Sequence, residues 1–209
     1  MRDLIKLMMV LLVSSVAQST IAQDIHFSNI HASPVHLNPA MTGIFNGGSA
    51  RFIGISRSQW TSFTNGFKTI SGSIDAKILQ TGSGFFGGGL QVFSDKAGDL
   101  DFKQTYVGGA LSYVQPVNKK GDSYFAAGFQ AAYIGNSFDL SKMVGFDTET
   151  SITFGDVDSN INYLDVSAGA AWYYTFNKNS YYYIGAAMHH INKPNVSFFD
   201  TNTRGNTIA

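Results

Sequence analysis

The chain of 209 residues contains no cysteine, and only 13% of its residues are charged. Without cysteine there are no disulfide bonds, no cysteine metal ligands and no thiol nucleophiles. A typical soluble domain has about 25% charged residues, so this chain is unusually poor in charge. Its 14 basic and 14 acidic side chains balance, which leaves no basic excess to neutralise the phosphates of a nucleic acid. These absences argue against a disulfide scaffold, a thiol enzyme and a nucleic-acid-binding protein.

Long hydrophobic runs are also missing. After residue 22, no segment reaches the roughly 18 consecutive apolar residues of a transmembrane helix. The chain has instead 22 glycines, 17 phenylalanines and 10 tyrosines. A membrane β-barrel has this kind of composition, because its lipid-facing apolar residues alternate with polar residues that face the lumen.

Residues 1–22 have the pattern of a secretory signal peptide. Arg2 and Lys6 form a short positive region before an apolar run over residues 7–13, and small or polar residues follow as far as Ala22. The run is too short for a membrane-anchoring helix. We therefore predict export, with cleavage after Ala22 and no cysteine for lipid attachment.

The mature chain divides into an irregular arm, residues 23–47, which is rich in turn-forming residues, and a barrel domain, residues 48–209. Seven segments of the barrel domain show the period of two that is typical of β-strands. They are 49–58, 67–79, 84–94, 102–115, 123–134, 161–176 and 181–191. In the clearest one, Leu164 lies on an apolar face and Asp165 and Ser167 lie on the other. Crossing a bilayer at a tilt takes about 9–11 residues, and these segments are long enough.

The connections between these segments alternate in length. The short ones are 80–83, 116–122 and 177–180, and the longer ones are 59–66, 95–101 and 135–160. Outer-membrane barrels have short periplasmic turns and longer outer loops. We predict an all-β, antiparallel up-and-down outer-membrane β-barrel. Because seven is an odd number of strands and the end of the chain is polar, we expect an incomplete barrel that lacks its C-terminal part.

No constellation of residues predicts catalysis, a cofactor or a metal ion. His26, His31 and His36 are five residues apart, whereas two ligands on one helix face are four apart. His189 and His190 would face opposite sides of a strand, so we interpret them as hydrogen-bonding residues. We therefore predict a protein that is not an enzyme.

Glycines and aromatic residues receive structural interpretations. Gly87, Gly88 and Gly89 lie in a predicted strand and lack the lysine of a phosphate-binding loop, so we interpret them as a packing feature or a bend. Many aromatic residues lie near predicted strand ends, where barrels have girdles at the membrane interfaces. They are Trp60, Trp172, Tyr173, Tyr174, Tyr181, Tyr182 and Tyr183.

Three blocks of residues carry a resemblance to a known family. They are Asp24, Phe27, Ser28, Pro34, Asn38, Pro39, Ala40 and Gly43; then Arg57, Gln59 and Trp60; and then His190, Asn192 and Pro194. In this order over residues 24–198, they resemble the PorP/SprF family of type IX secretion system membrane proteins. We treat them as family-signature positions with no partner contact assigned. Asn38 and Pro39 are expected to form a turn, and the Arg57 block to anchor the end of the first strand.

The resemblance implies an outer-membrane barrel that assists the type IX machinery in the secretion or surface attachment of cargo such as adhesins, in some members with a link to gliding. The implied partners are outer-membrane lipid, the machinery and the cargo. A passive porin or hydrophobic-solute channel stays open as an alternative, because its composition and strand pattern would be the same. A non-membrane surface β-protein fits the charge-poor strands less well. The arm and the segment 135–160 are candidate contact regions, because loops carry function more often than the scaffold does.

Overall fold

The computed structural model describes the greater part of the barrel domain and the end of the arm. The described residues are 33–59, 66–98, 101–118, 120–139, 159–177 and 180–198. The predicted signal peptide, the arm up to residue 32 and residues 140–158 lie outside them. No helix in the described ranges is long and apolar enough to cross a membrane.

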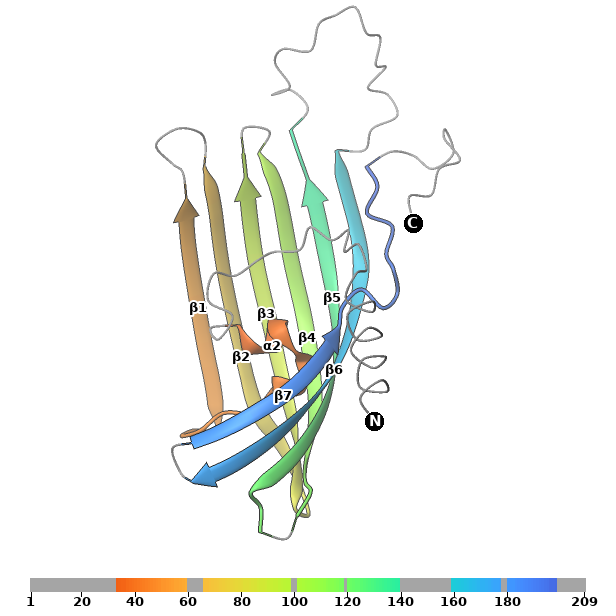
Figure 1. Ribbon diagram of the computed structural model, residues 1–209. Coiled ribbons are helices and arrows are strands. Elements are labelled where there is room, and N and C mark those ends of the chain that lie inside the picture. Colours follow the sequence, from red (N-terminus) through yellow and green to blue (C-terminus); the bar gives the residue numbers. More distant parts are fainter. Residues whose placement is uncertain are drawn as a thin grey trace, which may run out of the picture.

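Seven strands form one antiparallel sheet in which the spatial order follows the sequence order. They are β1 (Ala50–Gln59), β2 (Phe67–Thr81), β3 (Gly84–Ala97), β4 (Phe102–Pro116), β5 (Ser123–Ser137), β6 (Asn160–Asn177) and β7 (Ser180–Met188). The sheet curls into a half-barrel in which β6 and β7 bend round towards its concave side (Figure 1). The prediction of an all-β, up-and-down and incomplete barrel is confirmed.

The predicted strands match the observed ones closely, with one informative difference at the end of the sheet. Each of the seven predicted segments overlaps one observed strand, and β3 and β5 continue three residues further, to Ala97 and Ser137. The last strand, however, ends at Met188 and not at residue 191. From there the chain leaves the sheet and turns towards β6, where Ile191 donates a backbone hydrogen bond to Val166 at 2.9 Å.

The two faces of the sheet have the polarity expected of a barrel wall in lipid. The convex face exposes large apolar side chains, among them Phe52, Leu90, Leu111, Phe129, Leu164 and Ile184. The concave face buries polar side chains, among them Ser71, Asp75, Gln91, Ser112, Gln130 and Asp165. An exposed apolar face and a buried polar face are the reverse of a soluble protein and suit a barrel in a bilayer. The predicted face assignment of β6 is confirmed.

The described part of the arm lies on the concave side of the sheet (Figure 1). It forms a one-turn helix, α2 (Pro34–Leu37), and a 3-10 turn, η2 (Pro39–Met41). Each begins with proline, whose missing N–H costs nothing in a first helical turn. Asn38 stops α2 in an extended conformation and starts η2, because its side chain accepts a hydrogen bond from the backbone N–H of Ala40. The segment predicted as irregular thus contains two helical turns.

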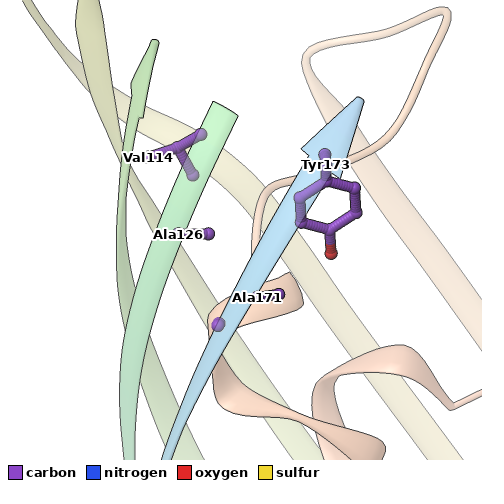
Figure 2. Close-up of a cluster of buried hydrophobic side chains, with 5 residues drawn as sticks. Val114, Ala126, Ala171 and Tyr173 are labelled. Atoms are coloured by element: carbon purple, nitrogen blue, oxygen red, sulfur yellow. The ribbon is translucent and has the colours of Figure 1, made fainter. Parts of the chain in front are cut away.

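A small apolar cluster lies between the arm and the sheet. Ala40 packs there against Val114, Ala126, Ala171 and Tyr173 of β4, β5 and β6 (Figure 2). Val114, Ala126 and Ala171 are successive partners in the strand register and make one row across the sheet. Two alanines in this row leave the space that the arm occupies. The core of the half-barrel is therefore completed by the arm and not by the sheet alone.

Candidate functional site

A row of very small residues crosses the concave face next to this cluster and provides a seat for the arm. It consists of Gly87 in β3, Ser112 in β4, Gly128 in β5 and Gly169 in β6, which are successive register partners. A Cβ atom on Gly128 would overlap the backbone of Pro39 and Ala40, and one on Gly87 would overlap the carbonyl of Thr42. Glycine in a strand often marks such a close approach of another backbone. We call these four residues the small-residue row.

Asn38 connects the arm to the last two strands. Its Nδ2 donates to the carbonyl oxygens of Ala170 in β6 at 3.2 Å and Ala186 in β7 at 3.3 Å. Its Oδ1 accepts from the N–H of Ala40 at 2.9 Å, next to Gly169, where a Cβ would overlap it. Asn38 is only 5% exposed, so water does not easily replace these partners. This family-signature side chain therefore ties the arm to β6 and β7 at one point.

A buried ion pair holds the other end of the arm. Arg51 in β1 donates from Nε and Nη2 to the two carboxylate oxygens of Asp75 in β2, at 2.9 Å and 2.7 Å. Asp75 is 1% exposed and also accepts from the backbone N–H of Gly43 at 2.7 Å. Two-point bonds between arginine and a carboxylate are stronger and more directional than neutral hydrogen bonds. The pair therefore fixes the arm where it leaves the concave face.

Gly43 is needed at this point for two reasons. Its φ is +74°, a backbone conformation that residues other than glycine rarely adopt. In addition, a Cβ would lie 2.8 Å from the Cα of Gly87 and 3.0 Å from the carbonyl oxygen of Ala76. The signature glycine thus combines the turn with a close approach to β2 and β3.

Aromatic rings of β3, β4 and α2 lie together on the concave face. Phe93 and Tyr106 are stacked, with ring centroids 4.5 Å apart and an angle of 9° between the planes. The His36 ring from α2 stands edge-on to both, at 5.9 Å and 6.1 Å. His36 also lies 6.3 Å from the ring of His189, at an angle of 30°. The arm and the segment after β7 therefore meet inside the half-barrel.

Both histidines after β7 turn towards polar residues of β6, so the prediction that they face opposite sides is wrong. The Nδ1 of His189 lies 3.2 Å from Ser167 Oγ, and that of His190 lies 2.7 Å from Asp165 Oδ1. The strand alternation has already ended at Met188, and His190 has a φ of +55°. The interpretation as hydrogen-bonding residues agrees with these contacts. Within the described ranges, no three histidine or acidic side chains are placed to hold a metal ion.

Residues 189–198, which we call the strap, run beside β6 after β7 has ended (Figure 1). Asn192 replaces part of a missing strand there. Its Nδ2 donates to the carbonyl of Leu164 at 2.6 Å, and its Oδ1 accepts from the N–H of Val166 at 3.1 Å. An unsatisfied backbone group costs several kcal/mol in lipid, which gives a physical reason for an amide side chain at this position.

The strap ends at the mouth of the half-barrel, by which we mean the end of the sheet where β4 begins and β5 ends. The ring of Phe198 is 4.8 Å from that of Phe138 and 6.3 Å from that of Phe102. Beside Phe138 lies a polar hollow of about 640 Å³, with Lys96, Asp101, Lys103 and Asp139 among its lining residues. The mouth therefore combines apolar contacts with charges of both signs.

The remaining signature residues lie in three parts of the chain. Arg57 donates from Nη2 to Gln59 Oε1 at 2.7 Å at the end of β1, on the surface, in keeping with the expected structural role there. Pro34 begins α2, and Pro194 lies in the strap. The others lie outside the described residues. They are Asp24, Phe27, Ser28 and Trp60.

Three of the aromatic residues that were predicted to form a girdle lie together in the structure. Trp172, Tyr174 and Tyr182 form a cluster near the turn between β6 and β7, with ring centroids 5.5–6.3 Å apart. Tyr173, in contrast, is 7% exposed and packs in the cluster under the arm. Its assignment to the girdle is wrong, because the strand alternation turns it to the concave face.

Sequence reasoning missed the residues that hold the arm in place. Asp75 lies in a predicted strand, but nothing in the local pattern pairs it with Arg51. The role of Gly128 and Gly169 depends on the register between strands, which the sequence of each segment alone does not give. The signal that was available is their regular appearance on the polar face of alternating segments, where glycine contributes no packing of its own.

A family model described as "Type IX secretion system membrane protein PorP/SprF" matches residues 19–208. The matched range includes the arm from residue 33, all seven strands and the strap. No match was found among curated proteins or among solved structures.

Proposed function

Since the chain belongs to the PorP/SprF family of type IX secretion system membrane proteins, we propose that it is an outer-membrane accessory barrel of that system. It assists the secretion or surface attachment of cargo proteins such as adhesins. The family is one of secretion-system membrane components and not of enzymes. The observation that carries the accessory role over a passive channel is the arm that packs on the concave face of the half-barrel.

A passive porin needs a continuous aqueous path through its barrel. In this chain the arm crosses the concave face of four neighbouring strands, along the small-residue row. Thr42 is fully buried there and accepts a hydrogen bond from Ser112 Oγ at 2.6 Å through its carbonyl oxygen. The Arg51–Asp75 pair and Asn38 hold the two ends of the same segment. A plug held at so many points favours a partner-binding barrel over an open pore.

We also propose a location and a domain organisation for the chain. Residues 1–22 act as the export signal, and the arm begins after them. The exposed apolar residues of the convex face contact outer-membrane lipid, as the polarity of the two faces supports. The partner contacts lie at the mouth, at the polar hollow beside Phe138, whose lining residues Asp139 and Ser159 border residues 140–158 in the sequence.

Deletion of the complete gene tests this function. Proteins at the cell surface and in the culture fluid are compared between the deletion strain, the wild type and the deletion strain complemented with the wild-type gene. Uptake of small solutes is measured in the same three strains. We expect the loss of one or a few type IX cargo proteins, with solute uptake unchanged. Unchanged secretion together with impaired uptake would contradict the proposal and favour the channel.

A further inference from the structure

We propose that the convex face of the half-barrel carries a site for an anionic membrane lipid. Three lysines at the mouth bind the phosphate group of the lipid, and an apolar hollow further along the same strands takes one of its acyl chains. The contact of this face with lipid rests on the proposed location in the outer membrane, whereas the two parts of the site rest on the strand register and on the convex face itself. The site borders the polar hollow to which the partner contacts are assigned.

The three lysines stand side by side on neighbouring strands, close to the mouth. Lys68 of β2 pairs with Lys96 of β3, and Lys96 pairs with Lys103 of β4. All three are exposed, and by the alternation of each strand they share the convex face with the exposed residues Ile70, Val92 and Val107. Like charges directly opposite each other in a sheet are destabilising. A row of this kind is therefore stabilised by an anion that lies over it.

Nearby carboxylates neutralise only part of this charge. Lys96 Nζ lies 2.7 Å from Asp101 Oδ1, and Asp139 lines the same polar hollow as Lys96 and Lys103. Within the part of the chain that the structure describes, no ion pair joins Lys68 or Lys103 to a carboxylate. A lysine binds phosphate as a point charge on a flexible stem. The ammonium groups of Lys68 and Lys103 can therefore converge on a phosphate group placed over Lys96.

Along the strands, the convex face changes from charged to apolar in the same order as a lipid molecule. The next row away from the mouth carries hydroxyl groups, where Ser94 is the register partner of Thr105. The row after it pairs Val92 with Val107, and both are about half exposed, at 49% and 52%. Successive rows are about 7 Å apart, because two residues of a strand span that distance. A lipid whose phosphate binds the lysines thus has its polar linkage beside the hydroxyl groups and its chains beside the valines.

An apolar hollow of about 590 Å³ lies further along the same strands. Its side chains on the convex face are apolar, and the largest belong to Ile74, Leu90, Leu111 and Phe129. Gly88 and Gly109 have no side chain and leave the space between these larger residues. Leu90 is six residues from Lys96, which is about 20 Å of strand. This distance lies within one leaflet of a bilayer, about 20 Å deep with its headgroups, so an acyl chain reaches the hollow.

Fluorescence quenching by brominated lipids tests the site. Since the chain has no cysteine, Val107→Cys gives a single attachment point for a fluorophore, on the convex face between the lysines and the hollow. The complete protein is placed in nanodiscs of phosphatidylcholine that contain a small fraction of one chain-brominated lipid. This lipid is either phosphatidic acid, whose headgroup is a phosphate monoester, or phosphatidylcholine. Quenching measures how often each lipid lies beside the fluorophore.

We expect phosphatidic acid to be preferred about tenfold over phosphatidylcholine. Lys68→Gln or Lys103→Gln should lower this preference about fivefold, the effect of one basic residue near an anionic membrane surface. The matched control is Lys120→Gln, which removes the same charge from the connection at the opposite end of β4 and should leave the preference unchanged. A preference that persists when Lys68, Lys96 and Lys103 are all replaced by glutamine, or that falls equally in Lys120→Gln, would overturn the proposal.

Gly109→Leu tests the hollow without changing any charge. The added side chain occupies the space of the acyl chain, so quenching by brominated phosphatidic acid should fall severalfold. Gly54→Leu is the control, because Gly54 lies in β1 outside the hollow and a Cβ there would meet no atom within 4 Å. Soluble glycerophosphate, which has the phosphate but no acyl chain, is added as a competitor and should have little effect. Full competition by it, or unchanged quenching in Gly109→Leu, would show that the lysines bind a free phosphate and that the hollow holds no lipid chain.

The outcome is separable from that of the gene deletion. Lysine-dependent lipid preference with unchanged secretion in the deletion strain would keep the lipid site and reject the proposed function. Lost secretion in the deletion strain with no lysine-dependent lipid preference would keep the function and reject the lipid site.

Discussion

The arm and the strap both cover the inside of the same sheet and both contain family-signature residues, yet they are held in opposite ways. In the arm, Val35 is 1% exposed and Ala40 and Thr42 are fully buried. In the strap, Ile191 and Val196 are about half exposed, at 44% and 53%. One segment is thus part of the core, and the other lies on its surface.

The hydrogen bonds that hold the arm are also more deeply buried than those that hold the strap. The arm ends on an ion pair with a fully buried carboxylate and on an asparagine with 5% exposure, whereas Asn192 makes its two bonds at an exposed position. Buried hydrogen bonds are costly to break, because the group left behind has no water to replace its partner. The comparison indicates that the arm is a fixed plug and the strap a removable cover. Substitutions in each segment test this difference.

The largest effect is expected from Asp75→Ala. This change leaves Arg51 and the N–H of Gly43 without their common acceptor. Breaking a buried ion pair costs about 3–5 kcal/mol, and we expect the lower end of this range because the Arg51 side chain is 22% exposed. Urea unfolding of the complete protein in detergent micelles measures the loss.

The matched control for Asp75→Ala is Arg57→Ala. Arg57 bonds to Gln59 at the surface, where a substitution typically changes the free energy of unfolding by less than about 0.5 kcal/mol. Equal losses for the two variants would show that the arm is not held by the buried pair, and would remove the main distinction between arm and strap.

A smaller but more specific effect is expected from Gly128→Val. The added side chain would overlap the backbone of Pro39 and Ala40, so the arm has to leave its seat. Overpacking a filled site costs about 1–3 kcal/mol. Ion conductance of the complete protein in planar bilayers should rise, because the plug no longer fills the lumen.

Gly54→Val is the control for this change in packing. Gly54 lies in β1, and a Cβ there would meet no atom within 4 Å, so both the free energy of unfolding and the conductance should stay near the wild-type values. If Gly128→Val also leaves the conductance unchanged, the arm is not the plug that its buried contacts indicate.

Asn38→Ala should have an effect of about 1–3 kcal/mol, the cost of leaving a buried partner unsatisfied. The carbonyl groups of Ala170 and Ala186 would lose their donor. Limited proteolysis of the arm, compared between Asn38→Ala and wild type, shows whether this loss is local. Asn38→Asp is the informative companion, because it keeps the acceptor for Ala40 but removes the donor to both strands.

The fold could be predicted from the sequence because a barrel wall repeats one simple rule. Apolar and polar residues alternate along each strand, as in barrels of this kind, so that Leu164 and Asp165 reveal their faces without any knowledge of their neighbours. Strand ends were predictable for the same reason, as the alternation stops where the chain turns. The largest difference is at β7, because Ile191 continues the apolar pattern although the backbone leaves the sheet after Met188.

The site was less predictable because its parts come together through register. Gly87, Gly128 and Gly169 form a row only when the pairing of β3 to β6 is known. The pairing of Arg51 with Asp75 likewise depends on which residues of β1 and β2 stand opposite each other. The signature residues Asn38 and Gly43 could be recognised from the family resemblance, but their partners could not. The local pattern therefore predicts the strands of the barrel wall, but it does not predict the contacts that hold the arm against the wall.

The smallest effect is expected from Asn192→Ala, and it should be local. The variant loses two hydrogen bonds at an exposed position, where water can replace the lost partners and a substitution typically changes the free energy of unfolding by less than about 0.5 kcal/mol. Because the strap is a cover and not part of the core, we expect the free energy of unfolding to change little. Amide hydrogen exchange of Val166 should become faster, since its N–H donates to Asn192 Oδ1. Asn192→Asp separates the two bonds: it keeps an acceptor for Val166 but removes the donor to Leu164, so the exchange of Val166 should stay slow. Faster exchange throughout β6, including residues paired with β5 such as Asn162, would show that the strap supports the whole strand, and the contrast between a fixed arm and a removable strap would then fail.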